Sequence, residues 1–454
     1  MLFRIAVLLP CLVATSHDWP GFRGHNLSGT SAETGLPIRF DAGTNGGWSI
    51  EVPPGRSSPV ITKNRIFLTA WDHDNLMVLG FDTRFGKKLW HYSIARSRRS
   101  EFDDRNNDPA SPTSATDGEA LYSFFPDFGL IALSVEGREL WKLPLGPFTS
   151  SYGMGSSPVV HGETVFLQCD QTRGSFLVAV HKRTGKVKWR VDRPEVIEGW
   201  STPLILRERE ELIALGSTGV EAFDRNTGKR RWSFPAADGI MIPVPITDGK
   251  TLIATIRGSE QSVFPTWANI LAALDRDKDG KLVAEELEKR YHRNDFGIAD
   301  PDRDGYITEQ EWNRFRNRGV GEFGITCIRL SDNSVVWRHK RGLPYVPSPV
   351  LYQGVLYSVR NGGIITSIDA GTGEVRKEGR APDAAGLYIA SPVAGDGKVY
   401  FAGAEGKITI VKAAAEWEVL AVNDLADGIT ATPAIADRAL FVRTHKKLYC
   451  FRQP

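Results

Sequence analysis

The chain has few cysteines, no excess charge of either sign, and a single run of strongly apolar residues. Its 454 residues include 4 cysteines, 56 Lys and Arg, and 54 Asp and Glu, which give a formal net charge of +2. A chain with this balance lacks the broad basic field with which proteins bind nucleic acid, so we expect no nucleic-acid partner. Beyond residues 1–16 no apolar run is long enough to cross a bilayer, so we expect no membrane span.

The cysteines give no sign of a disulfide framework or of a zinc site. Cys169, Cys327 and Cys450 lie far apart, show no CxxC spacing, and each stands in a strand-like run. We expect them to be small buried apolar residues. The GxSxG, P-loop and HExxH motifs are absent as well. The sequence therefore predicts no catalytic residue, and we favour a non-enzymatic role.

Residues 1–16, MLFRIAVLLPCLVATS, have the pattern of a secretory signal peptide. Arg4 precedes an apolar stretch, and the small residues Ala14 and Ser16 have the spacing of a cleavage site. A buried N-terminal strand is the alternative. Pro10 stands before Cys11 where a lipoprotein signal needs a small residue, so we expect no lipid anchor. The sequence thus predicts export, to the periplasm or out of the cell.

One unit recurs along most of the chain. It begins as Ser-x-Pro-Val or a close variant, continues as a β-branched and aromatic run, and ends as Asp-x-x-Thr-Gly-x-x-x-Trp. The glycine suits a tight turn with a positive φ, and the tryptophan offers a large ring to a neighbouring sheet. Units of roughly 40–50 residues are typical of β-propeller blades. The copies begin at Ser57, Ser111, Ser157, Thr202, Pro243, Ser348, Ser391 and Thr432, with Trp90, Trp141, Trp189, Trp232, Trp337 and Trp417 near the end of six of them, and Val375 in the strand of the sixth copy where tryptophan is expected.

The last copy lacks its outer strand, and an unpaired strand lies at the other end of the chain. Residues 48–52 begin with Trp48 and have no copy of their own. Pairing them with the strand around Cys450 would close the ring and remove its exposed edges. We therefore predict an all-β fold: an eight-bladed β-propeller closed by an N-terminal strand. The predicted organisation is a signal peptide (1–16), an N-terminal extension (17–47), blades one to five in part (48–263), an EF-hand insert in blade five (264–319), and the remaining blades (320–454).

This repeat resembles the tryptophan-docking repeat of pyrroloquinoline-quinone-type propellers, and the resemblance spans Trp48 to Phe451 apart from the insert. That family includes quinoprotein alcohol dehydrogenases and the propeller lipoprotein of outer-membrane assembly. The resemblance implies the fold more firmly than a function. In its enzymes a disulfide between adjacent cysteines often covers the quinone, and this chain has no such pair. A quinone-dependent dehydrogenase, with bound pyrroloquinoline quinone, is therefore an alternative, and an outer-membrane assembly scaffold is a second alternative.

Two segments within residues 264–319 match the calcium-binding EF-hand loop at every fixed position. Calcium takes six to eight oxygen ligands, and Gly280 and Gly305 permit the sharp turn that such a loop needs. A solvated acidic turn without metal is the alternative. Leu282 and Ile307 occupy the positions at which paired loops join, and the short stretch between the loops predicts a truncated helix near Phe296. The sequence predicts two Ca²⁺ sites, one formed by Asp275, Asp277, Asp279, the Lys281 carbonyl and Glu286, the other by Asp300, Asp302, Asp304, the Tyr306 carbonyl and Glu311.

Large side chains precede several of the Ser-x-Pro segments and should surround one mouth of the propeller channel. Such an aromatic mouth could hold a protein segment, a peptide or a glycan. Packing between blades is the alternative role for these side chains. The candidate ligand-binding residues are Tyr152, Trp200, Tyr345 and Tyr388. The sequence thus favours an exported calcium-binding propeller that acts as a binding or scaffold module, and it does not identify the ligand.

Overall fold

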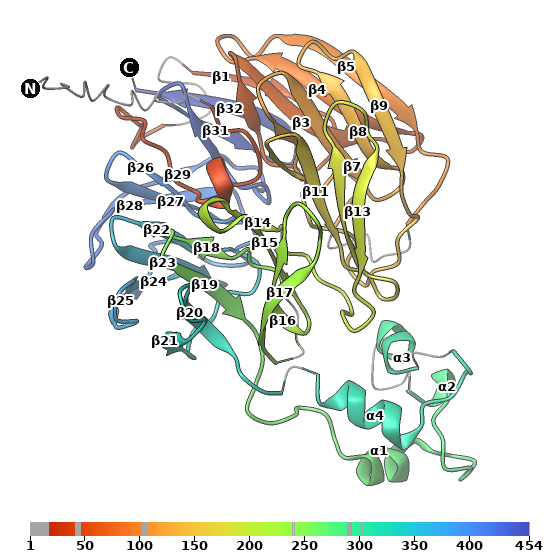
Figure 1. The fold of residues 1–454 in the computed structure, drawn as a ribbon. Helices are drawn as coiled ribbons and strands as arrows, with labels where there is room; N and C mark the ends of the chain where they lie inside the picture. The colour runs from red at the N-terminus through yellow and green to blue at the C-terminus, as the bar shows by residue number, and fades with distance from the viewer. Residues whose placement is uncertain are drawn as a thin grey trace, which may run out of the picture.

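The computed structural model shows eight four-stranded antiparallel sheets arranged around an axis (Figure 1). It describes residues 18–40, 47–100, 107–237, 239, 241–287, 293–300, 303–318 and 320–453. The predicted signal peptide and Asp302 lie outside the described residues. The eight-bladed propeller predicted from the repeats is confirmed, with helices confined mainly to one insertion in the fifth blade.

The blades follow one another along the chain, each built from consecutive strands. Blades 1 and 2 consist of β2 (Val60–Thr62), β3 (Arg65–Trp71), β4 (Asn75–Asp82), β5 (Lys88–Ala95), and β6 (Ala115–Thr116), β7 (Ala120–Phe125), β8 (Gly129–Ser134), β9 (Glu139–Pro144). Blades 3 and 4 consist of β10 (Val159–His161), β11 (Thr164–Cys169), β12 (Phe176–His181), β13 (Val187–Asp192), and β14 (Leu204–Leu206), β15 (Glu211–Gly216), β16 (Gly219–Asp224), β17 (Arg230–Pro235). Blades 5 and 6 consist of β18 (Ile246–Thr247), β19 (Thr251–Ile256), β20 (Gly324–Arg329), β21 (Val335–His339), and β22 (Val350–Tyr352), β23 (Val355–Arg360), β24 (Ile364–Asp369), β25 (Val375–Arg380). Blades 7 and 8 consist of β26 (Val393–Gly395), β27 (Lys398–Ala402), β28 (Lys407–Lys412), β29 (Val419–Asp424), and β30 (Ala434–Ala436), β31 (Ala439–Arg443), β32 (Lys447–Arg452), β1 (Trp48–Glu51).

The ring closes as the sequence predicts. Strand β1 pairs with β32 and places Trp48 opposite Cys450. The outer strand of blade 8 thus comes from the N-terminal end of the chain, and its three other strands come from the C-terminal end.

At five junctions the tryptophan of an outer strand docks on a turn of the next blade. Trp337 shows the arrangement: its indole N–H donates to the carbonyl of Ala370 at 2.8 Å. Gly373 in the same turn has φ +76°, and a Cβ there would lie 2.6 Å from the Trp337 ring. Glycine is therefore required both for the turn and for the close approach of the ring. The same indole–carbonyl bond is made by Trp48, Trp90, Trp141 and Trp189.

The junction between blades 4 and 5 uses an arginine in place of the docking tryptophan. Arg209 donates to the carbonyl of Leu330 at 2.6 Å, which is the acceptor that an indole would take. Trp232 instead donates to Glu211 of its own blade at 3.3 Å. The turn that faces this junction contains Asn333, not glycine, at a positive φ of 59°.

Two predictions about the tryptophan positions are wrong. Lys377 of blade 6, not Val375, pairs with the third strand at the tryptophan position. Trp417 lies before β29, and Ala421 occupies the docking position of blade 7. Trp417 packs against the preceding blade, blade 6, where the Lys377 amine lies 4.6 Å from the centre of the Trp417 ring. Trp417 therefore lies in the connection between β28 and β29 and not in the outer strand.

A ring of hydroxyl groups joins the blades near the axis and explains the Ser/Thr-Pro pairs. Each blade contributes one residue to this ring. At seven junctions that residue donates its backbone N–H to the hydroxyl of the equivalent residue in the next blade. The equivalent residue in blade 2 is Thr113, so the predicted start at Ser111 is two residues early. Blade 5 has Val244 here and offers no hydroxyl. The donor–acceptor pairs are Ser58–Thr113, Thr113–Ser157, Ser157–Thr202, Val244–Ser348, Ser348–Ser391, Ser391–Thr432 and Thr432–Ser58.

The N-terminal extension lies across the propeller axis. Trp19 exchanges backbone hydrogen bonds with Ile61 of blade 1, and Thr30 forms a bridge with Ala394 of blade 7. Between them, the fully buried Arg23 donates to the carbonyl oxygens of Ser348 at 2.9 Å and Pro349 at 2.6 Å. Burial lowers the pKa of Arg23 to about 9. The extension thus joins blades 1, 6 and 7.

The two ends of the propeller carry different loops. Neighbouring strands in a blade are antiparallel. The turns between second and third strands therefore lie at the same end of the propeller as the links between blades. The insertion between β19 and β20 belongs to this end, which we call the insert face. Turns between first and second strands, and between third and fourth strands, lie on the opposite face.

Candidate metal centre and insert face

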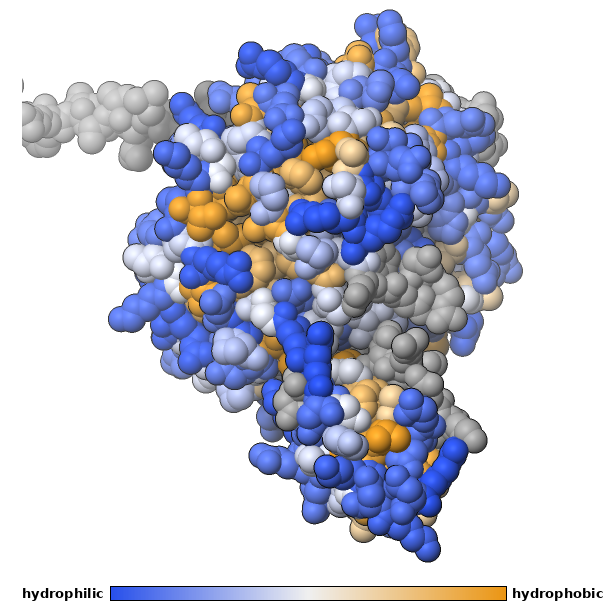
Figure 2. All heavy atoms as spheres, turned by 90° about the vertical axis from the view of Figure 1, so that its right-hand side faces the viewer, coloured by the Kyte–Doolittle hydropathy of each residue, from blue (hydrophilic) through white to orange (hydrophobic). Residues whose placement is uncertain are grey.

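The insert is a small helical module with a core of its own. It contains α1 (Trp267–Leu274), α2 (Ala284–Leu287), α3 (Arg293–Ala299) and α4 (Glu309–Arg316), and it projects from the propeller (Figures 1 and 2). Helix α3 includes Phe296, so the predicted truncated helix is confirmed. The surface of the module is mostly hydrophilic in Figure 2, because its apolar side chains face inward. The buried core residues are Ile270, Leu282, Leu287, Ala299, Ile307, Trp312 and Phe315.

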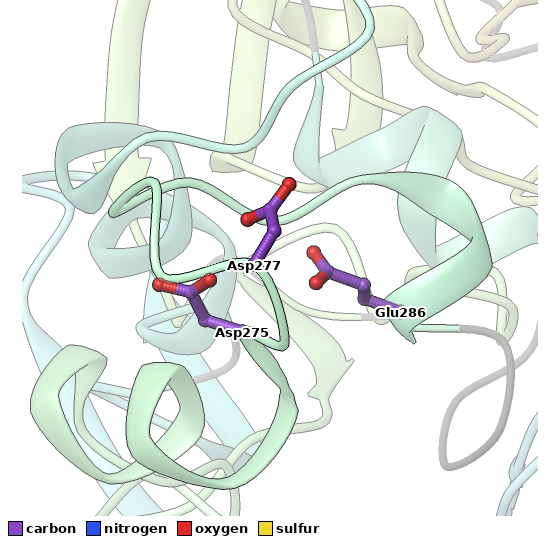
Figure 3. Close-up of side chains that lie close together, drawn as sticks. All are labelled: Asp275, Asp277 and Glu286. Carbon is purple, nitrogen blue, oxygen red and sulfur yellow. The ribbon is translucent and has the colours of Figure 1, made fainter.

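The first loop brings three carboxylates together. Asp275, Asp277 and Glu286 each offer an oxygen within 4.8 Å of the others, and Figure 3 shows them on the inner side of the loop. Backbone N–H groups orient them: Gly280 donates to Asp275 at 3.1 Å, and Arg276 donates to Glu286 at 2.8 Å. Three converging carboxylates repel one another, and a divalent cation would relieve that repulsion. The donor set is all oxygen, as Ca²⁺ prefers.

The second loop repeats this geometry where the structure describes it. Asp300 accepts hydrogen bonds from the backbone of Arg303 at 2.8 Å and Gly305 at 3.2 Å. Glu311 accepts from the backbone N–H of Thr308 at 2.8 Å, and the two residues form a capping box at the start of α4. The side chain that should ligate from the last position of the loop is therefore fixed by the helix that follows.

The two loops are paired. Leu282 and Ile307 form an antiparallel bridge whose N–H···O distances are 3.3 and 2.8 Å. Both side chains are fully buried. The predicted bridge is confirmed, so the short connection between the loops does not prevent the usual EF-hand pairing.

The module also contacts the propeller. A stem is formed by the parallel bridge between Ser259 and Val320. In addition, Arg173, in the β11–β12 turn of blade 3, donates to the carbonyl oxygen of Asp300 at 2.9 Å. The first residue of the second loop is therefore tied to a blade that lies far from the stem in sequence.

The predicted mouth residues lie in different environments. Tyr152 is 37% exposed, and its ring lies 5.7 Å from that of Trp200, centroid to centroid. Trp200 itself is buried, and its indole donates to the carbonyl of Gly153 at 2.7 Å. Tyr345 is partly exposed and has the Arg257 guanidinium 4.4 Å from its ring. Tyr388 is buried in the core between blades 6 and 7.

A buried ionic network near the insert face was not predicted. Arg193 donates to Asp170 at 2.5 Å and to Glu221 at 2.8 Å, and all three side chains are buried. Burial raises the pKa of Asp170, and the attraction of Arg193 opposes this shift. These residues are separated in sequence and stand in ordinary charged stretches, so no local pattern identifies them.

Comparison with known proteins shows which family has this architecture. A family model described as outer membrane protein assembly factor BamB matches residues 126–295 and 320–454. An EF-hand model matches residues 294–315, which contain the second loop. None of the curated proteins matches the chain.

Solved structures share the fold at low sequence identity. BamB from Moraxella catarrhalis is 12% identical, with a TM-score of 0.58 over 89% of this chain and 98% of its own. A europium-containing methanol dehydrogenase is 13% identical, with a TM-score of 0.59 over 94% of this chain and 89% of its own. Quinohemoprotein alcohol dehydrogenase from Comamonas testosteroni is 14% identical, with a TM-score of 0.56 over 97% of this chain and 82% of its own. At such identities the likeness shows the fold alone. The family model, in contrast, covers more than half of the chain, and the chain belongs to the pyrroloquinoline-quinone-type propeller family described as outer membrane protein assembly factor BamB.

Proposed function

We propose that this chain is an exported calcium-binding propeller that presents its insert face to a partner protein. The observation that carries the proposal is the paired EF-hand module, whose first loop gathers three carboxylates and whose second loop is tied to blade 3. A divalent cation would neutralise the clustered charges, and the contact through Arg173 connects the module with the propeller. Within the described residues, no helix has both the length and the apolar character needed to cross a membrane.

Each loop would hold one Ca²⁺ ion. In the first loop Asp275, Asp277 and Asp279 would provide side-chain oxygens, Lys281 its carbonyl, and Glu286 both carboxylate oxygens. The second loop would use Asp300, Asp302, Asp304, the Tyr306 carbonyl and Glu311 in the same roles. When bound, the ions would neutralise the carboxylates and order the module, since metal binding and local folding are coupled.

Calcium titration of the metal-free protein by calorimetry tests the two sites. We expect two ions per chain, with Glu286→Gln and Glu311→Gln each removing one of them. Glu285→Gln is the matched control, because Glu285 is adjacent to Glu286 but exposed. Absence of calcium-dependent heat, or equal stoichiometry in all variants, would contradict the proposal.

A partner would meet the insert face near Tyr152 and Tyr345. Tyr152 is exposed and rests on Trp200, which gives the partner a rigid aromatic contact. A photo-crosslinking amino acid at position 152, introduced in the native host, should capture a protein in the presence of calcium. The same probe at Val187, exposed on an outer strand of blade 3, serves as the control. Equal capture at both positions, or none at 152, would argue against this surface.

The dehydrogenase alternative has its own test. With added pyrroloquinoline quinone and calcium, we expect neither a change in quinone absorbance nor alcohol-dependent dye reduction. Quinone-dependent turnover would replace the binding role by an enzymatic one.

Export is tested at the N-terminus of the protein purified from its host. Mass spectrometry should find a chain that begins at His17. Retention of residues 1–16 in the folded protein would contradict the proposed cleavage.

A further inference from the structure

Two cations stacked on aromatic rings lie where the insert leaves the propeller. The Arg257 guanidinium lies 4.4 Å from the centre of the Tyr345 ring. The Lys340 amine lies 4.9 Å from the centre of the Phe323 ring. Arg257 follows β19, Phe323 precedes β20, Lys340 follows β21, and Tyr345 lies in the link from β21 to β22, so all four belong to the insert face (Figure 1). We call these four residues the stem patch.

The Arg257 guanidinium has a ring contact but no ionic partner. Among the described residues, no carboxylate pairs with it and no oxygen accepts a hydrogen bond from it. Burial lowers the pKa of Arg257, so its charge is already partly removed from water. The residue is still partly exposed, so a partner can reach it. An approaching carboxylate would form charge-assisted hydrogen bonds without breaking an existing ion pair.

The carboxylates of this surface are already used by other cations. Glu260 lies 3.2 Å from the Lys340 amine, and Glu322 forms an ion pair with Arg338. Arg341, adjacent to Lys340, is exposed and has no partner among the described residues. The surface around the stem patch thus carries two guanidinium charges that no described carboxylate neutralises.

Tyr345 restricts the position of the Arg257 guanidinium. A guanidinium held over an aromatic ring is attracted to the face of that ring. A group that is already held in place loses less conformational entropy when a partner binds. Arginine and tyrosine are also enriched among the residues that contribute most to protein–protein affinity. The pair of Arg257 and Tyr345 therefore has the composition and the geometry of an anchor for another protein.

We propose that the stem patch binds an acidic segment of the partner protein, with carboxylates on Arg257 and Arg341. This inference rests on the partner-binding role proposed for the insert face, and it names the chemistry of the partner. An extended polyanion such as nucleic acid needs a broad basic surface. Here only two guanidinium groups are unpaired, and their cationic neighbours Lys340 and Arg338 are neutralised. A short acidic peptide segment matches that charge.

Fluorescence anisotropy of a labelled octaglutamate peptide, titrated with the full chain and calcium at constant ionic strength, tests the patch. We expect octaglutamate to bind more tightly than octaglutamine, and Arg257→Gln to weaken its binding about tenfold or more. Arg190→Gln is the matched control, because the Arg190 guanidinium is stacked 3.7 Å from the centre of the Phe176 ring but is paired with Asp192 at 2.9 Å. This control should bind as the wild type does.

The ring is tested without a change of charge. Tyr345→Ala should weaken octaglutamate binding, because the guanidinium is no longer held in place, whereas Tyr345→Phe keeps the ring and should bind as the wild type does. A general attraction between charges would leave both variants unchanged, and that result would contradict the proposed anchor.

Three further results would overturn the proposal: no binding of octaglutamate, equal affinity in the wild type and Arg257→Gln, or tighter binding of a DNA duplex of equal charge. Circular dichroism checks that the variant folds. If it does not, Arg341→Gln decides instead, because Arg341 is exposed, and an unchanged affinity would reject the patch.

Failure of this inference can be distinguished from failure of the proposed function. Capture of a protein at position 152 without octaglutamate binding would reject the acidic segment and leave the partner-binding role. Octaglutamate binding without capture at position 152 would instead count against that role.

Discussion

The contact between tryptophan rings and turn glycines can be measured at one junction with an internal control. Gly373 and Gly354 both lie in turns of blade 6 and have nearly equal φ angles, +76° and +78°. A Cβ at position 373 would lie 2.6 Å from the Trp337 ring, whereas nothing lies within 4 Å of a Cβ at position 354. Alanine at either position has the same backbone strain, about 1–2 kcal/mol. Only Gly373→Ala must also displace the ring, at a further cost of about 1–3 kcal/mol.

The free energy of unfolding of both variants can be compared by urea denaturation followed by fluorescence. We expect Gly373→Ala to lose about 1–3 kcal/mol more than Gly354→Ala, because the displaced ring loses its packing. In a Trp337→Ala background the clash is absent, so the two glycine substitutions should become equally costly. Equal losses in the wild-type background would show that the ring contact does not stabilise the junction.

Three further predictions concern charge and metal. Arg193→Met should lower the free energy of unfolding by about 3–5 kcal/mol, because two buried carboxylates lose their partner. In the same urea assay, Arg183→Met at an exposed site should have little effect. The Arg231 guanidinium and turn N–H groups lower the pKa of Asp224 from 3.8 to about 2. The small stabilising effect of the ionised Asp224 is therefore present above pH 4 and lost as the pH falls toward 2. ¹³C NMR of labelled aspartate should show that the pKa of Asp224 is higher in Arg231→Gln. Removal of calcium by a chelator should increase hydrogen exchange in the insert and leave the blades unchanged, and equal exchange with and without calcium would contradict metal-dependent ordering.

The sequence predicts those features that depend on local repeats. Trp48 could be assigned to blade 8 because the last copy of the repeat lacks its outer strand, and the strand that begins at Trp48 belongs to no copy. The EF-hand loops follow from fixed spacing, and so does the bridge between Leu282 and Ile307. Local patterns were sufficient here because the interacting residues are either close in sequence or related by the repeat.

Other features depend on contacts that a repeat cannot specify. Trp417 lies before its strand and Ala421 takes the docking position, which is visible only once β28 and β29 are paired. Arg209 replaces an indole because it competes for the same carbonyl in three dimensions. The role of Arg23 was missed because the N-terminal extension has no repeat, and its acceptors in blade 6 lie more than 300 residues away in the chain.

The origin of the last blade has a consequence for biosynthesis. Strand β1 is synthesised before the other strands of the propeller, and its partner β32 is synthesised after all of them. The circle therefore cannot be completed before β32 has been synthesised. Contacts between distant segments form slowly, so the early strand has an unpaired edge throughout this interval.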